Sequence, residues 1–178
     1  MKKIIYLLAL LSFPTIADWQ YINTTDDFTD ESIEYVLFED NEHRLEVRKS
    51  STPENSTWLF ITMKGLGTFE PYAPVDIRVD KNKSYSVDKK QSEFSKRWLN
   101  FPLYVWEPQT IGILLGAEHK KGEVNFCNQL DYIGSGKNLK FRYHTSKLKS
   151  QSYSVSLSGA QNALSKLVNL TSCTEKQI

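Results

Sequence analysis

The sequence predicts a mainly β protein: an antiparallel β-sandwich or curled sheet with a C-terminal α-helix packed on it. Two observations carry this prediction. Short β-prone segments, separated by turn residues, follow one another along most of the chain, which is the pattern of antiparallel sheet proteins. Convincing helical spacing occurs only near the C-terminus, so one helix is expected to cover the sheet.

The N-terminal part supplies three expected strands. A polar, turn-like stretch at Asn23–Asp27 precedes a first strand at Ile33–Phe38. Apolar and charged residues alternate over His43–Arg48, as in a strand with one buried face. Trp58–Met63 is β-prone on both faces, which predicts a central position in the sheet.

The middle of the chain is less uniform. Val75–Asp80 alternates most regularly, and a turn leads from it into a further strand at Ser84–Val87. The aromatic stretch Trp98–Trp106 contains Pro102, which favours an edge strand or a bulge because proline cannot donate to the strand ladder. Gln109–Ala117 has no clear period, so a short helix and a buried strand both remain open.

The last third predicts a hairpin and then the helix. Leu139–His144 and Ser152–Leu157 both alternate, as expected for two paired strands with one face in the core. Ser158 and Gln161 have the spacing of a capping box at a helix start. The apolar residues that follow share one helical face: Ala160, Leu164, Leu167 and Val168.

The first residues have the features of a cleavable secretory signal. Two lysines precede the apolar run Ile4–Leu11, and small residues end the segment at Ala17. The run is much shorter than the roughly 20 apolar residues that span a membrane. We therefore expect a signal peptide at 1–17 for export in a Gram-negative-type bacterium, and a single β-rich periplasmic domain at 18–178. No second long apolar run follows, so no membrane span is expected after cleavage.

Charge and cysteine content limit the partners and the redox state. The formal net charge is +1 at pH 7, without a basic cluster, so neither nucleic acid nor an anionic membrane is expected as partner. Cys127 and Cys173 are the only cysteines. In an oxidising compartment an even number usually forms disulfides, and a redox-active pair normally has closer spacing. A structural Cys127–Cys173 disulfide is therefore predicted.

Motifs for catalysis or metal binding were sought without success. His43, His119 and His144 lie far apart in the sequence and outside any metal-binding motif. No G-x-S-x-G sequence occurs. Asp76 and Asp80 share a strand face with an arginine between them, which favours a cross-strand charge ladder over a pair of catalytic carboxylates. No catalytic residue, metal ligand or cofactor is expected.

Aromatic residues give the one candidate binding site. The chain has 4 Trp, 9 Tyr and 9 Phe, and a group of them clusters in one stretch: Trp98, Phe101, Tyr104 and Trp106. Such a cluster commonly belongs to a core. Alternatively, it forms an exposed aromatic ridge that binds a protein or a glycan.

Several short motifs resemble a group of proteobacterial periplasmic proteins associated with type VI secretion clusters. They are Trp19 followed by Asp26–Asp30, the strand Leu45–Arg48, the segment Ile77–Asp80, and Leu139–Tyr143 leading through Ser156–Gly159 to a final helix that ends near Cys173. The resemblance implies a non-catalytic accessory role. The order of strands and helix is also similar to invasion-associated locus B-type secreted proteins, which implies a β-sandwich.

Three functional hypotheses follow. The leading one is a non-enzymatic periplasmic binding or accessory domain that contacts another periplasmic or envelope protein, with the link to type VI secretion that the resemblance implies. The first alternative is an inhibitor of a cell-wall hydrolase of the lysozyme type. The second is an enzyme of unrecognised type. The oligomeric state is left open by the sequence.

Overall fold

The described part of the chain is almost entirely β. The computed structural model describes residues 18–50, 56–65, 67–70, 73–87, 103–117, 128–147 and 149–170, with side chains throughout except at 103–106 and 117. Its elements are β1 (Gln20–Thr25), β2 (Ser32–Glu39), β3 (His43–Ser50), β4 (Ser56–Met63), β5 (Val75–Val79), β6 (Tyr85–Val87), β7 (Leu103–Glu107), β8 (Thr110–Ala117), α2 (Gln129–Ser135), β9 (Asn138–His144), β10 (Ser150–Ser156) and α3 (Ala160–Leu167).

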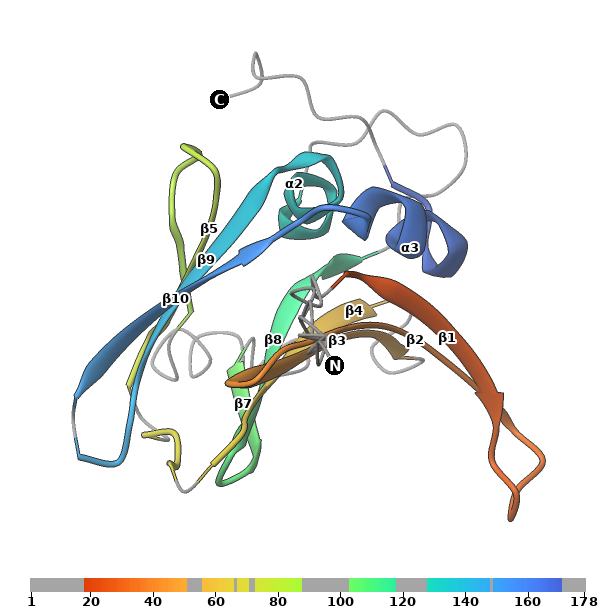
Figure 1. Ribbon diagram of the computed structural model, residues 1–178, viewed down its shortest axis with the longest axis horizontal. Coiled ribbons are helices and arrows are strands. Elements are labelled where there is room, and N and C mark those ends of the chain that lie inside the picture. Colours follow the sequence, from red (N-terminus) through yellow and green to blue (C-terminus); the bar gives the residue numbers. More distant parts are fainter. Residues whose placement is uncertain are drawn as a thin grey trace, which may run out of the picture.

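The strands form two antiparallel sheets. The larger sheet has six strands in the order β1-β2-β3-β4-β8-β7, and the smaller has four in the order β10-β9-β5-β6. Figure 1 shows both helices over one face of the six-stranded sheet, and the four-stranded sheet lies on this same side. α3 packs against β1, β2 and β3. The predicted fold class, mainly β and antiparallel with a C-terminal helix packed on a sheet, is confirmed.

The core forms where the apolar rows of the two sheets meet the helices. In the six-stranded sheet, Val36, Val47, Leu59 and Ile113 lie directly opposite one another on successive strands, and all four are fully buried. Such cross-strand neighbours on one face are the unit of sheet stabilisation. The smaller sheet contributes its own buried alternation, in which Phe141 is the largest fully buried side chain.

The stretches left open by the sequence are strands at the far side of the large sheet. β8 settles Gln109–Ala117 as a strand, buried between β4 and β7. β7 occupies the sheet edge, and its register with β8 shifts between Val105 and Glu107. The expected edge strand is therefore confirmed at Leu103–Glu107. β4 lies centrally between β3 and β8, as predicted.

The N-terminal strand β1 corrects one expectation. Asn23–Thr25 was expected in a turn, but these residues pair with Ser32–Glu34 as the end of an extended hairpin. Their side chains are exposed, so this part of β1 is stabilised by the strand ladder and needs no apolar face. The turn itself begins one residue later, at Asp26.

The predicted capping box does not form at α3, and a different capping box forms at α2. The apolar face predicted for α3 is buried, but its N-cap is Gly159, with a φ of 78° and no side-chain cap hydrogen bond, and not Ser158. The Asp18 carboxylate lies against Gly159, where negative charge favours a helix N-terminus. The real capping box starts α2, which the sequence reading missed: Asn128 and Asp131 cap each other's backbone N–H groups at 3.1 and 2.9 Å.

Candidate functional site

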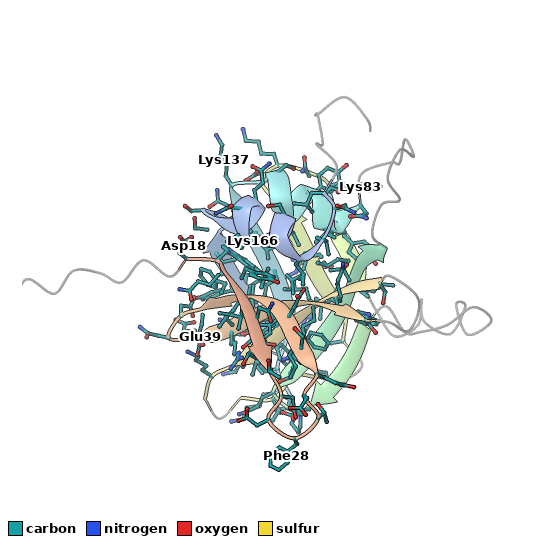
Figure 2. The ribbon with its side chains drawn as sticks, turned by 90° about the vertical axis from the view of Figure 1, so that its right-hand side faces the viewer. Asp18, Phe28, Glu39, Lys83, Lys137 and Lys166 are labelled. Carbon is teal, nitrogen blue, oxygen red and sulfur yellow. The ribbon has the colours of Figure 1, made fainter. Side chains whose placement is uncertain are left out.

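The hairpin formed by β1 and β2 carries the most exposed apolar side chains that the structure describes. Phe28, in the turn, is 99% exposed, and Ile33, at the start of β2, is 39% exposed. Figure 2 shows Phe28 at one extremity of the molecule, with its ring directed away from the sheets. Phenylalanine is usually buried in a folded domain, so this fully exposed ring on a projecting turn is the candidate contact site of the described residues.

The Asp26 carboxylate holds the tip in one conformation. Its Oδ1 accepts hydrogen bonds from the N–H groups of Phe28 (2.8 Å) and Thr29 (2.9 Å). The chain closes behind it, because Asp26 N–H donates to the Glu31 carbonyl and Asp30 N–H donates to the Asp26 carbonyl, both at 2.9 Å. Asp30 takes a left-handed φ of 56°, which Asp tolerates better than most residues. Phe28 is thus presented on an ordered turn.

The tip is also strongly acidic. From Asp26 to Glu34 the chain has five carboxylates and no lysine or arginine. The backbone hydrogen bonds from Phe28 and Thr29 lower the pKa of Asp26 below its ordinary value, so this carboxylate stays ionised at neutral pH. The exposed Phe28 ring is therefore surrounded by negatively charged side chains.

The base of the hairpin is anchored in the domain. Trp19, which is buried, donates from Nε1 to the Ser156 carbonyl at 2.8 Å and packs 5.4 Å from the Phe38 ring. The Lys166 ammonium group of α3 lies 5.9 Å from the centre of the Tyr21 ring on β1. These contacts place α3 across the start of the hairpin and leave its tip projecting (Figure 1).

The outer face of the six-stranded sheet is self-contained by comparison. Glu46 is buried there and forms ion pairs with Arg44 and Arg48 on the same strand. The Arg48 guanidinium group lies 5.5 Å from the centre of the Phe60 ring. That ring covers Gly112, where an added Cβ would come within 2.9 Å of it. Charged and aromatic groups on this face thus meet one another.

A third polar and aromatic group lies inside the molecule, between the sheets. His43 of β3 shares a 2.9 Å hydrogen bond with the Tyr143 hydroxyl of β9, and the Tyr153 hydroxyl of β10 donates to Asp40 Oδ2 at 2.7 Å. The Phe141 ring packs edge-on to His43, with centroids 5.2 Å apart. Burial lowers the pKa of His43, against the opposing charge of Asp40. Since His43 is only 3% exposed, this cluster joins the two sheets and is poorly placed to act on a substrate.

Asp76 and Asp80 do not share a strand face as expected, because β5 ends at Val79 and Asp80 lies in the turn after it with a left-handed φ of 50°. Asp76 accepts from Arg142 Nε at 2.8 Å across to β9, so the predicted cross-strand charge pairing holds for Asp76 only, and its partner is Arg142 rather than the arginine between the two acids. Asp80 accepts the backbone N–H groups of Lys137 (3.0 Å) and Asn138 (2.9 Å). The two carboxylates thus serve the sheet and the turn separately.

The predicted disulfide and much of the predicted aromatic cluster fall outside the described residues. Trp98, Phe101, Cys127 and Cys173 lie outside the described residues. Tyr104 and Trp106 fall on the edge strand β7, where Tyr104 pairs with Gly112, and their side chains are not described. The aromatic ridge and the disulfide remain predictions.

No match was found when the chain was compared with family models, curated proteins and solved structures. The resemblance to secretion-associated periplasmic proteins therefore stays a prediction.

The described residues contain neither a cluster of metal ligands nor a helix that could cross a membrane. Within these ranges, no group of three or more His, Cys, Asp or Glu side chains converges on a common point. Neither described helix has the length and apolar character needed to cross a membrane.

The exposed tip was missed as a site when only the sequence was considered. The signal was available as Asp26-Asp27-Phe28-Thr29-Asp30, a phenylalanine inside an acidic turn with no alternating apolar neighbours. A ring in that setting has no strand face to bury it. The richer aromatic stretch at 98–106 drew attention instead.

Proposed function

We propose that this chain is an exported, non-enzymatic domain that binds another protein of the periplasm or envelope, and that the β1–β2 hairpin makes the contact. The observation that carries the proposal is the full exposure of Phe28 on an ordered turn. Burying a Phe side chain is worth about 1.5–3 kcal/mol. The isolated domain does not gain this free energy, so it is available to a partner.

The order of the tip strengthens the proposal. A flexible loop loses conformational freedom when it binds, and this loss reduces affinity. Here the Asp26 carboxylate and two backbone hydrogen bonds already restrict the turn. A side chain presented in this way suits an interface anchor, because anchors are commonly aromatic residues held in their bound conformation.

The proposed compartment rests on the N-terminal signal pattern. If peptidase cleaves after Ala17, the domain begins at Asp18, immediately before the buried Trp19. This arrangement would leave the anchored base of the hairpin intact after export. The link to type VI secretion rests on the sequence resemblance alone.

A second candidate is an inhibitor of a cell-wall hydrolase. The observation that favours it is again the hairpin, because a projecting apolar tip can enter a substrate cleft, whereas a flat sheet face cannot. The two candidates differ in the identity of the protein that the tip contacts.

In-cell photo-crosslinking tests both. Benzoylphenylalanine would replace Phe28 in the full-length protein in its native host, and Lys83 in a matched control. Lys83 is exposed on the turn before β6, far from Phe28 in Figure 2. We expect position 28, and not position 83, to crosslink to one periplasmic or envelope protein. A secretion subunit would support the accessory role, and a cell-wall hydrolase the inhibitor role. No adduct at position 28 would overturn the proposal.

A further inference from the structure

We infer that the partner of the β1–β2 hairpin is a protein whose surface has an apolar pocket for the Phe28 ring, bordered by lysine or arginine side chains. This inference rests on the proposed function and specifies its partner. It follows from three observations. Carboxylates surround Phe28, three of them form no ion pair within the described residues, and backbone N–H groups of the turn are already hydrogen-bonded.

The tip is acidic in a chain that is balanced overall. The chain as a whole is close to neutral, with 22 basic and 21 acidic residues. The β2–β3 turn is acidic too, but there Glu39 pairs with Lys64 and Asp40 accepts from the Tyr153 hydroxyl. The turn between β5 and β6 is mixed, with Asp80, Lys81 and Lys83, and the turn between β9 and β10 contains Lys147 and Lys149. Among the turns that the structure describes, only the β1–β2 turn joins a run of carboxylates to an exposed aromatic ring.

These carboxylates are available to an outside cation. Asp27, Asp30 and Glu31 form no ion pair within the described residues, and all three are exposed. Asp26 and Glu34 serve the hairpin itself, since Asp26 accepts two backbone N–H groups and Glu34 accepts from Asn23. Three carboxylates around Phe28 therefore remain to complement positive charge on a partner.

The backbone of the turn leaves side chains as the means of contact. The N–H groups of Phe28 and Thr29 are bound by Asp26, and those of Asp26 and Asp30 by carbonyl oxygens of the turn. Pairing of the tip with a partner strand would require such groups to be free. The groups still available at the tip are the Phe28 ring and the free carboxylates. The ring can enter an apolar pocket, and the carboxylates can pair with lysine or arginine side chains at the edge of that pocket.

The same charges argue against two other classes of partner. Nucleic acid and anionic membrane surfaces attract basic protein surfaces and repel a tip of this sign. A phenyl ring alone could enter a lipid surface. The carboxylates around Phe28 would then have to approach the negatively charged headgroups, which repel them. A basic protein surface with an apolar pocket can accommodate both the Phe28 ring and the carboxylates that surround it.

The test uses the photo-crosslinker at position 28 in a second background. Asp27→Asn, Asp30→Asn and Glu31→Gln would be combined, which removes the free carboxylates and leaves Asp26 to hold the turn. An exposed ion pair contributes about two- to threefold to binding. We therefore expect the adduct yield to fall on the order of tenfold. Lys81→Gln with Lys83→Gln is the matched control, for which the yield should stay unchanged.

The outcomes separate this inference from the proposed function. Mass spectrometry of the adduct should place the crosslink in an apolar pocket of the partner that lysine or arginine side chains border in space. An adduct of unchanged yield in the neutralised background, or one mapped to an acidic surface, overturns the basic pocket but leaves the hairpin as a protein-binding site. Loss of the adduct in both backgrounds overturns both. Sedimentation of the purified protein with phosphatidylcholine vesicles containing phosphatidylglycerol should show no binding, and binding that depends on Phe28 would overturn the inference in favour of a membrane.

Discussion

The hairpin tip and the cluster between the sheets use the same kinds of residue for opposite purposes. Each combines an aromatic ring with a carboxylate that accepts hydrogen bonds. At the tip these are Phe28 and Asp26, and between the sheets Phe141 packs on His43, whose backbone N–H donates to Asp40. Phe141 is 1% exposed and Phe28 is 99% exposed. Residue type alone therefore does not show whether a ring is buried or exposed. Inside, the ring packs between two sheets, whereas at the tip it is exposed and, as we propose, contacts a partner.

The largest expected loss of stability comes from removing the Phe141 ring between the sheets. Phe141→Ala removes a buried side chain that packs on His43 and Tyr153, and such changes cost about 3–5 kcal/mol. Urea denaturation followed by tryptophan fluorescence would measure the free energy of unfolding. If this variant does not fold, Phe141→Leu should fold with a smaller loss. A loss under 1 kcal/mol for Phe141→Ala would mean that the cluster does not join the sheets.

A smaller loss of stability is expected when one hydroxyl group is removed from the cluster. Tyr143→Phe leaves His43 Nε2 without its partner, while His43 Nδ1 already has none. An unsatisfied buried polar atom costs about 1–3 kcal/mol. Tyr35→Phe, at a half-buried position on β2, is the matched control and should change the unfolding free energy by less than about 0.5 kcal/mol. Equal losses in the two variants would contradict this role for His43.

The sequence predicted the inner region better than the tip. Alternation at Val75–Asp80 and Leu139–His144 identified the strands whose buried faces meet between the sheets, because burial on one face leaves a period of two. It did not reveal that His43 and Tyr143, which are far apart in the chain, would form a hydrogen bond. That pairing depends on the packing of the two sheets, which no local pattern records.

The tip was harder to predict for a physical reason. The polar residues Asn23–Thr25 form strand through backbone pairing with β2, and exposed strands carry no apolar period. Helix α2 was missed because its signal is the capping box of Asn128 and Asp131 in a short segment. The capping box expected at Ser158 does not form, because Gly159, with a left-handed φ, is the N-cap of α3. Local signals thus compete, and tertiary context decides between them.

Acid should weaken the inner cluster through His43. Its pKa in the folded protein is lowered from 6.5, primarily by burial, so the unfolded chain binds a proton at a pH where the folded protein does not. The contribution is therefore fully favourable above about pH 6.5 and is lost as the pH falls below that value. Urea titrations between pH 7.5 and 5 should show declining stability. His43→Phe should flatten this dependence, and an unchanged slope in that variant would assign the effect to other groups.

The smallest expected effect on stability is at Phe28. Phe28→Ala removes a ring that touches little of the domain, so the free energy of unfolding should change by less than about 0.5 kcal/mol, as measured by the same urea titration used for Phe141→Ala. Its binding to the crosslinked partner should weaken by about 2 kcal/mol, the range of an interface anchor. The same substitution at two positions would then separate the two roles of an aromatic ring in this fold. A clear loss of stability at position 28 would instead mean that the ring packs within its own chain, and the tip would lose its standing as a binding site.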